Sequence, residues 1–226
     1  MAAWFDQAVL EEIERVHHAL GQIEPTLACI LGACASDLLR DYSQQDPMDL
    51  RIRRRKSPLP KKPFLDAFAE SVERFISRTE SARETLKGAG IGKAILLDSR
   101  DISLRKLGMR TPFDCAVTSP PYATALPYID TQRLSLVWLG LTPPSEIQSL
   151  EATLVGSRES RGHERKRLAE ALENNPAELP DSQIDYCRTL MRALGPSDGF
   201  RRKAVPTLLY RYFEGMAASF RGVRSV

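Results

Sequence analysis

The sequence lacks the cysteine and histidine patterns of a metal site. Its cysteines form no Cys-x-x-Cys pair and share no ligand spacing with the three histidines. We interpret them as buried thiols of a protein kept in a reducing compartment. No apolar run approaches the roughly 20 residues that a membrane helix needs, and the acidic, amphipathic N-terminus is unlike a signal peptide. We therefore expect a cytoplasmic protein without a metal; its cysteines are Cys29, Cys34, Cys115 and Cys187.

Strong net charge is also missing, because the 226 residues carry a formal charge of only +3. The positive charge is instead clustered, since residues 51–62 ("RIRRRKSPLPKK") hold seven basic residues and no acid. Two interpretations stay open: a loop that contacts nucleic-acid phosphates, or a solvated linker. The first makes DNA a partner, and its candidate binding residues are Arg51, Arg53, Arg54, Arg55 and Lys56.

Apolar residues recur at helical spacing over most of the chain, and two short apolar runs indicate strands at 93–98 and 113–118. Continuous apolar strands are typical of a parallel sheet covered on both faces. The expected class is therefore α/β, a partial domain with parallel strands and large helical additions. We expect a helical region at 1–87, an α/β core segment at 88–144 and a second helical region at 145–226. Helices are expected at 4–23, 26–42, 64–87, 130–140, 183–194 and 203–220, with two short ones within 145–182.

Three glycines, Gly88, Gly90 and Gly92, imitate a dinucleotide-binding loop. A phosphate-binding glycine turn follows a strand and opens a helix. This one follows a helix and precedes a predicted strand, so we expect a helix end and a loop.

The run "DCAVTSPPY" (114–122) ends an apolar stretch in Ser119-Pro120-Pro121-Tyr122. Two prolines stop a strand, because they cannot donate to a ladder, and they fix the backbone. The carbonyl oxygens of Ser119 and Pro120 become rigid acceptors, and the Tyr122 ring offers a flat face. Such a site suits a planar substrate with an exocyclic amine, such as a base that has left its duplex.

At this point the chain resembles the amino methyltransferases, which methylate the exocyclic nitrogen of cytosine (N4) or adenine (N6) in DNA with S-adenosylmethionine. "TSPPY" resembles their catalytic motif, and "AILLDSRDI" resembles the preceding cofactor motif. The resemblance implies a Rossmann-like methyltransferase domain, a restriction-modification type of system, and cofactor binding by Asp98 and Ser99. It also implies catalytic roles for Ser119, Pro120, Pro121 and Tyr122. Two structural alternatives remain open: the Tyr122 ring could fill a space in the core, and Asp98 could be the N-cap of a helix.

The chain departs from this family in lacking the glycine-rich cofactor loop, the acid that holds the ribose, and a strand after the last helix. It therefore resembles one subunit of a split enzyme, a fragment, or an inactive binding protein. The first two predict weak binding of S-adenosylmethionine by the chain alone and exposed apolar surface near the strands, with the glycine-rich loop carried by a partner chain or by a missing segment. The alternatives are a noncatalytic DNA-binding or scaffold subunit and, ranked below it, an RNA-directed amino methyltransferase.

Overall fold

The computed structural model describes residues 2–90, 92–124, 126–158 and 162–226. The chain divides into two compact units that alternate along the sequence. Unit 1 comprises residues 1–91 and 127–147, and unit 2 comprises residues 92–126 and 148–226. Each unit has its own cluster of buried hydrophobic side chains, so each is described by itself.

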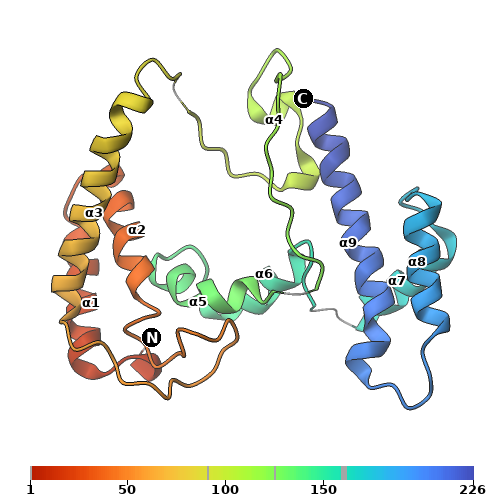
Figure 1. Ribbon diagram of the computed structural model, residues 1–226, viewed down its shortest axis with the longest axis horizontal. Helices are drawn as coiled ribbons and strands as arrows, with labels where there is room; N and C mark the ends of the chain where they lie inside the picture. Colours follow the sequence, from red (N-terminus) through yellow and green to blue (C-terminus); the bar gives the residue numbers. More distant parts are fainter. Residues whose placement is uncertain (1, 91, 125, 159–161) are drawn as a thin grey trace. The chain divides into compact units, whose positions relative to one another are not determined.

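The expected parallel sheet is wrong. Within the described ranges there is no β-strand, and pairing is limited to an isolated antiparallel bridge between Gln45 and Arg54. Segments 93–98 and 113–118 instead run as open, non-helical traces (Figure 1). Most of their apolar side chains are exposed: Leu96 is fully exposed and Val117 is 95% exposed. The physical reason is that a strand exists only through a neighbouring strand, and the described residues supply none. A Rossmann-like α/β fold is therefore not the fold of this chain.

Unit 1 is built from four α-helices, as the 3.6-residue spacing of apolar side chains predicts. They are α1 (Gln7–Leu20), α2 (Pro25–Leu38), α3 (Phe64–Thr85) and α5 (Tyr128–Trp138), with short 3-10 turns η1 (Ala2–Trp4) and η3 (Pro144–Glu146). The start of α2 is fixed locally, because the Glu24 carboxylate accepts hydrogen bonds from the main-chain amides of Thr26 and Leu27.

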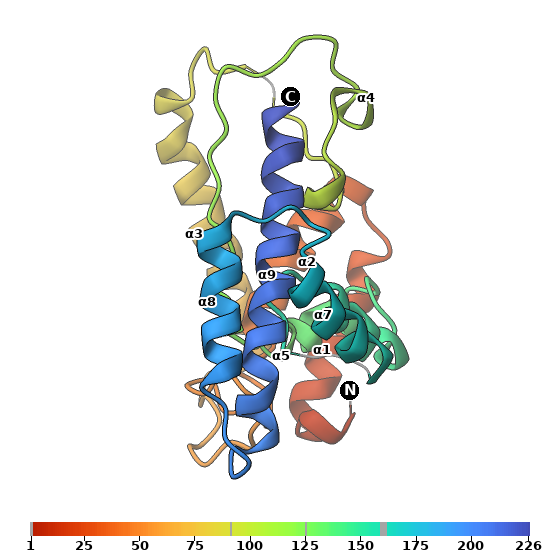
Figure 2. The ribbon, with the colours of Figure 1, turned by 90° about the vertical axis from the view of Figure 1, so that its right-hand side faces the viewer.

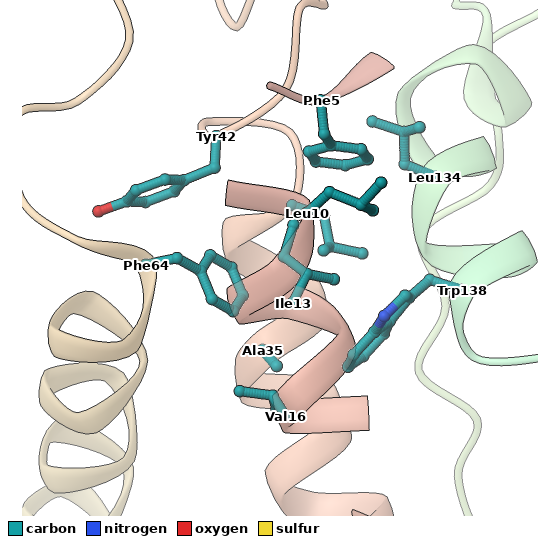
Figure 3. Close-up of a cluster of buried hydrophobic side chains, with 10 residues drawn as sticks. Phe5, Leu10, Ile13, Val16, Ala35, Tyr42, Phe64, Leu134 and Trp138 are labelled. Atoms are coloured by element: carbon teal, nitrogen blue, oxygen red, sulfur yellow. The ribbon is translucent and has the colours of Figure 1, made fainter. Parts of the chain in front are cut away.

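Side chains from all four helices meet in the core of unit 1 (Figure 3). Ile13 on α1 is fully buried, and burial of such a side chain contributes about 1.5–3 kcal/mol. The core residues are Phe5, Leu10, Ile13, Val16, Ala35, Leu39, Tyr42, Phe64, Leu134 and Trp138.

The basic loop between α2 and α3 is attached to this core at its base. The Tyr42 hydroxyl donates to the carbonyl of Lys62 at 2.9 Å, and its ring packs edge-on against Phe64. The Gln45 side chain is buried and donates to the carbonyl of Asp130 on α5. Beyond these buried anchors, most of residues 43–63 are exposed.

Unit 2 contains the helical hairpin α8 (Asp181–Arg192) and α9 (Phe200–Arg224), which run side by side in Figure 2, with α7 (Gly162–Asn174) packed on α9. Its core comprises Leu168, Ala171, Leu172, Leu179, Ile184, Cys187 and Tyr210. Three shorter elements complete it: η2 (Ser99–Asp101), α4 (Leu104–Leu107) and α6 (Ile147–Thr153), the last of which begins at the unit boundary. The helices predicted from the sequence are thus confirmed, with ends shifted by a few residues.

The glycine run follows α3, as predicted, and Gly88 adopts a left-handed φ of +85° just beyond the helix end. Ile91 within it lies outside the described residues. The interpretation of the cysteines as buried thiols is wrong for three of the four. Cys187 is buried, but Cys29 and Cys115 are exposed and Cys34 is intermediate. Cys115 is exposed because its segment is not part of a sheet.

Candidate functional site

The Ser119–Tyr122 motif lies at the surface of unit 2, at the end of the open segment 113–118 rather than at the end of a strand. Ser119 and Pro120 are exposed, and Tyr122 is 64% exposed. The alternative in which Tyr122 plugs a core is therefore wrong. The Tyr122 ring and the residues Ser119 and Pro120 therefore lie where a ligand can reach them.

A tight turn fastens the motif to the segment after α6. The amide of Thr124 donates to the carbonyl of Gly156 at 3.0 Å, and the Arg158 guanidinium donates to the carbonyl of Thr124. Gly156 has a left-handed φ of +87°, and its missing side chain leaves room for the carbonyl group of Tyr122. The conformation just after the motif is thus set by contacts 32 to 34 residues away in sequence.

An apolar cavity of about 550 Å³ lies beside the motif, within unit 2. Pro120, Pro121 and the side chains of 113–118 form one wall, while η2, α4 and α9 form another. Ser99 lines it as well, and its hydroxyl is hydrogen-bonded to that of Ser219 on α9 at 2.9 Å. The cavity therefore brings two predicted catalytic residues and one predicted cofactor residue to one place. Asp98, Ser119 and Tyr122 lie outside its lining.

Asp98 is the N-cap of η2, as in the structural alternative. One carboxylate oxygen accepts from both the main-chain amide and Nε of Arg100 at 2.9 Å, and the other accepts from Nη2 of the same residue. The hydrogen bonds from the Arg100 side chain, above all, lower the pKa of Asp98 to about 2. The carboxylate is thus already occupied by its own helix and by Arg100.

These observations test whether the expected residues can hold S-adenosylmethionine. Ser99 faces a cavity of suitable size, but the Asp98 carboxylate is engaged by Arg100 and is not part of the cavity wall. The cavity lining is mostly apolar, whereas the cofactor carries a ribose, an amine and a carboxylate. The residues of this chain therefore do not fit the complete cofactor.

The cationic side chains of the basic loop fall into two groups: those that hold the loop together and those that could contact a ligand. Arg55 donates to the carbonyls of Asp41 and Pro58, so it holds the loop together. Arg53 pairs with Asp49 at 2.9 Å while remaining largely exposed.

Two further cations of unit 1 lie against one aromatic ring. The guanidinium groups of Arg54 and Arg133 are 5.4 and 5.3 Å from the centre of Trp4, a cation–π geometry. The side chains of Arg51 and Lys56 are exposed and have no polar partner among the described residues. Of the five predicted nucleic-acid contacts, these two are the ones left available.

Sequence reasoning missed the α9 wall of the cavity. Met216, Phe220 and Val223 recur at helical spacing on α9, and this pattern could have predicted a face for the motif segment. It also missed Gly156, whose role depends on a carbonyl group far away in sequence.

No family model, no curated protein and no solved structure matches the chain. Across the residues that the structure covers, we find no helix with both the length and the hydropathy needed to cross a bilayer.

Proposed function

We propose that this chain is a component of an S-adenosylmethionine-dependent DNA methyltransferase that modifies the exocyclic amine of cytosine (N4) or adenine (N6). The observation that carries the proposal is the shared cavity. Pro120 and Pro121 of the catalytic-like motif and Ser99 of the cofactor-like motif line the same 550 Å³ space, although about 20 residues separate them in sequence. This proximity is what the resemblance requires of the two motifs.

The accessible motif suits recognition of an amine-bearing ring. The Ser119 side-chain hydroxyl and the carbonyl group of Pro120 would accept hydrogen bonds from the amine, which orients its nitrogen and raises the electron density of the lone pair. The exposed ring of Tyr122 would stack on the face of the base. A base in a duplex cannot reach these groups, so the target would be flipped out or single-stranded.

S-adenosylmethionine would supply an electrophilic methyl group, and most of its binding site would belong to a partner chain that carries the glycine-rich loop. This division follows from the poor fit of Asp98, whose carboxylate is held by Arg100. We therefore expect weak cofactor binding by the chain alone.

The test is transfer of labelled methyl groups to DNA by the purified chain, with and without the product of the adjacent gene. Ser119→Ala and Tyr122→Ala should lower the rate at least about 100-fold, as expected for groups that position the reacting amine. Ser81→Ala and Tyr186→Ala, which change exposed residues of the same types, should leave it unchanged. Absence of label in both reactions would reject the proposal.

A noncatalytic DNA-binding or scaffold subunit is the second candidate, and the basic loop favours it. The loop is anchored to the unit 1 core and exposes Arg51 and Lys56 without needing the motif at all. In that case Ser119→Ala would change neither DNA affinity nor the activity of the assembled system.

A further inference from the structure

We propose that segment 113–118 of unit 2 is the docking site for an extended, apolar segment of the partner chain, which adds to it by main-chain hydrogen bonding. The inference rests on the proposed function only for the identity of that partner. Three features of segment 113–118 support it: its main chain, its side chains and the cavity beside it.

The main chain of the segment is unpaired over most of its length. The Phe113 amide donates to the carbonyl of Val226, but no hydrogen bond joins the main chain of residues 115–118 to another part of the chain that the structure describes. Such a row of free donors and acceptors is a template for a second extended chain.

The side chains of the segment are those of a buried strand, yet they are exposed. Val117 is 95% exposed, Phe113 is 50% exposed and Cys115 is exposed. Leaving such side chains in water forfeits the burial that stabilises folded proteins, at about 25 cal/mol for each Å² of apolar surface. A ligand that covers them would recover this contribution.

The cavity indicates the chemistry of the ligand. It lies between segment 113–118 and α9, and Met216, Phe220 and Val223 form its far side. Asp114 is the one charged residue among its described lining residues. An extended segment that pairs with the main chain and directs every second side chain into this space needs apolar side chains at alternate positions. A charged segment would not suit the apolar wall, and a helical segment would leave the free amides unpaired.

A random ten-residue peptide library displayed on phage provides the probe, selected against the full chain. The enriched peptides should alternate apolar and other residues. Their synthetic versions should slow hydrogen exchange within 113–118 by about tenfold or more, while the exchange of α1 and α3 stays unchanged.

A pair of proline variants tests main-chain pairing directly. Successive amides of an extended segment point to opposite edges, so Ala116→Pro and Val117→Pro remove donors from different edges. One of them should weaken peptide binding at least about tenfold and the other should not. Each proline variant is the control for the other, and circular dichroism should show the same helix content in both variants.

Three outcomes would overturn the inference. The first is that no peptide is enriched. The second is that peptide binding survives both proline substitutions, and the third is that both substitutions abolish peptide binding equally. A further outcome concerns the chain without peptide. If hydrogen exchange within 113–118 slowed as the protein concentration rose, and sedimentation showed dimers, the site would belong to a second copy of the chain and not to a partner chain. Peptide binding requires neither DNA nor S-adenosylmethionine, so its failure leaves the methyl-transfer result unaffected, and the reverse also holds.

Discussion

Gly156 lies directly against the main-chain carbonyl group of Tyr122, and a Cβ atom added to Gly156 would be 2.8 Å from that oxygen. Gly156 also has a φ of +87°, a region that L-residues rarely adopt. The two residues meet because the Thr124 amide donates to the Gly156 carbonyl. The backbone just after the motif is therefore held by a contact that tolerates only glycine.

Gly156→Ala should displace this contact. The new methyl group would collide with backbone rather than with a flexible side chain, so we expect a loss of about 1–3 kcal/mol in the free energy of unfolding. Because the motif is held through Tyr122, methyl transfer should fall at least about tenfold. Denaturant unfolding and the methyl-transfer assay measure the two effects. Gly92→Ala is the control, since Gly92 lies outside the left-handed region of φ and has open space around it. Equal stability of the two variants would contradict the assigned contact.

The exposure of Cys115 gives a second prediction. Cys115 lies in the open segment and is exposed, whereas Cys187 is fully buried in the core of unit 2. Burial raises the pKa of the Cys187 thiol to about 11, which further lowers its reactivity at neutral pH. Iodoacetamide should therefore modify Cys115 in the native protein and leave Cys187 unmodified until the protein is unfolded. Peptide mass spectrometry locates the labels.

The controls for this experiment are Cys115→Ser, which should remove one fast label, and denatured protein, in which Cys187 should react as well. Slow labelling of Cys115 in the native chain would mean that segment 113–118 is covered in solution. It would then argue for the strand that the sequence predicts and against the open conformation.

The helices could be predicted from the sequence and the strands could not, for one physical reason. A helix satisfies its own backbone hydrogen bonds, so the spacing of Leu10, Ile13 and Val16 was enough to place α1. A strand depends on a neighbour, and local composition does not reveal whether a neighbour exists. Residues 93–98 and 113–118 have strand composition, but the described residues provide no neighbour for them.

The candidate site was predictable only in part, because its members are set by long-range contacts. The sequence indicated Pro120, Pro121 and Ser99, and the three do line one cavity. It could not show that Arg100, two residues after Asp98, occupies the Asp98 carboxylate. The basic loop was likewise visible as a cluster of charge, but the sequence did not separate Arg55, which binds main-chain carbonyls, from the cations that remain available.

The difference between Arg55 and the cations that could contact DNA gives a third prediction. The double variant Arg51→Gln, Lys56→Gln should weaken DNA binding. The slope of a plot of log affinity against log salt concentration should also become shallower by about 1 to 2. The stability of the double variant should be unchanged, because both side chains are exposed and neither forms a hydrogen bond or ion pair with another described residue. Arg55→Gln should instead destabilise unit 1, since it removes donors to the carbonyls of Asp41 and Pro58. Fluorescence anisotropy at several salt concentrations and thermal unfolding separate the two effects. An unchanged salt dependence in the double variant would remove the loop from the proposed DNA interface.

The ion pair between Asp98 and Arg100 gives the last prediction. Arg100 lowers the pKa of Asp98 from 3.8 to about 2, so the folded state favours the ionised carboxylate. The pair therefore stabilises the protein fully above the unfolded-state pKa, and this contribution is lost as the pH falls from about 4 to 2. Arg100→Gln should raise the pKa of Asp98 toward 3.8, and it should remove that part of the acid dependence of stability. The effect on stability should be small, because both side chains are partly exposed to solvent. Carbon-13 NMR titration of the carboxyl group measures the pKa directly. The control is Arg105→Gln, which changes a neighbouring exposed arginine and should leave the pKa of Asp98 near 2. If the pKa of Asp98 also stayed near 2 in Arg100→Gln, another group would be holding the carboxylate.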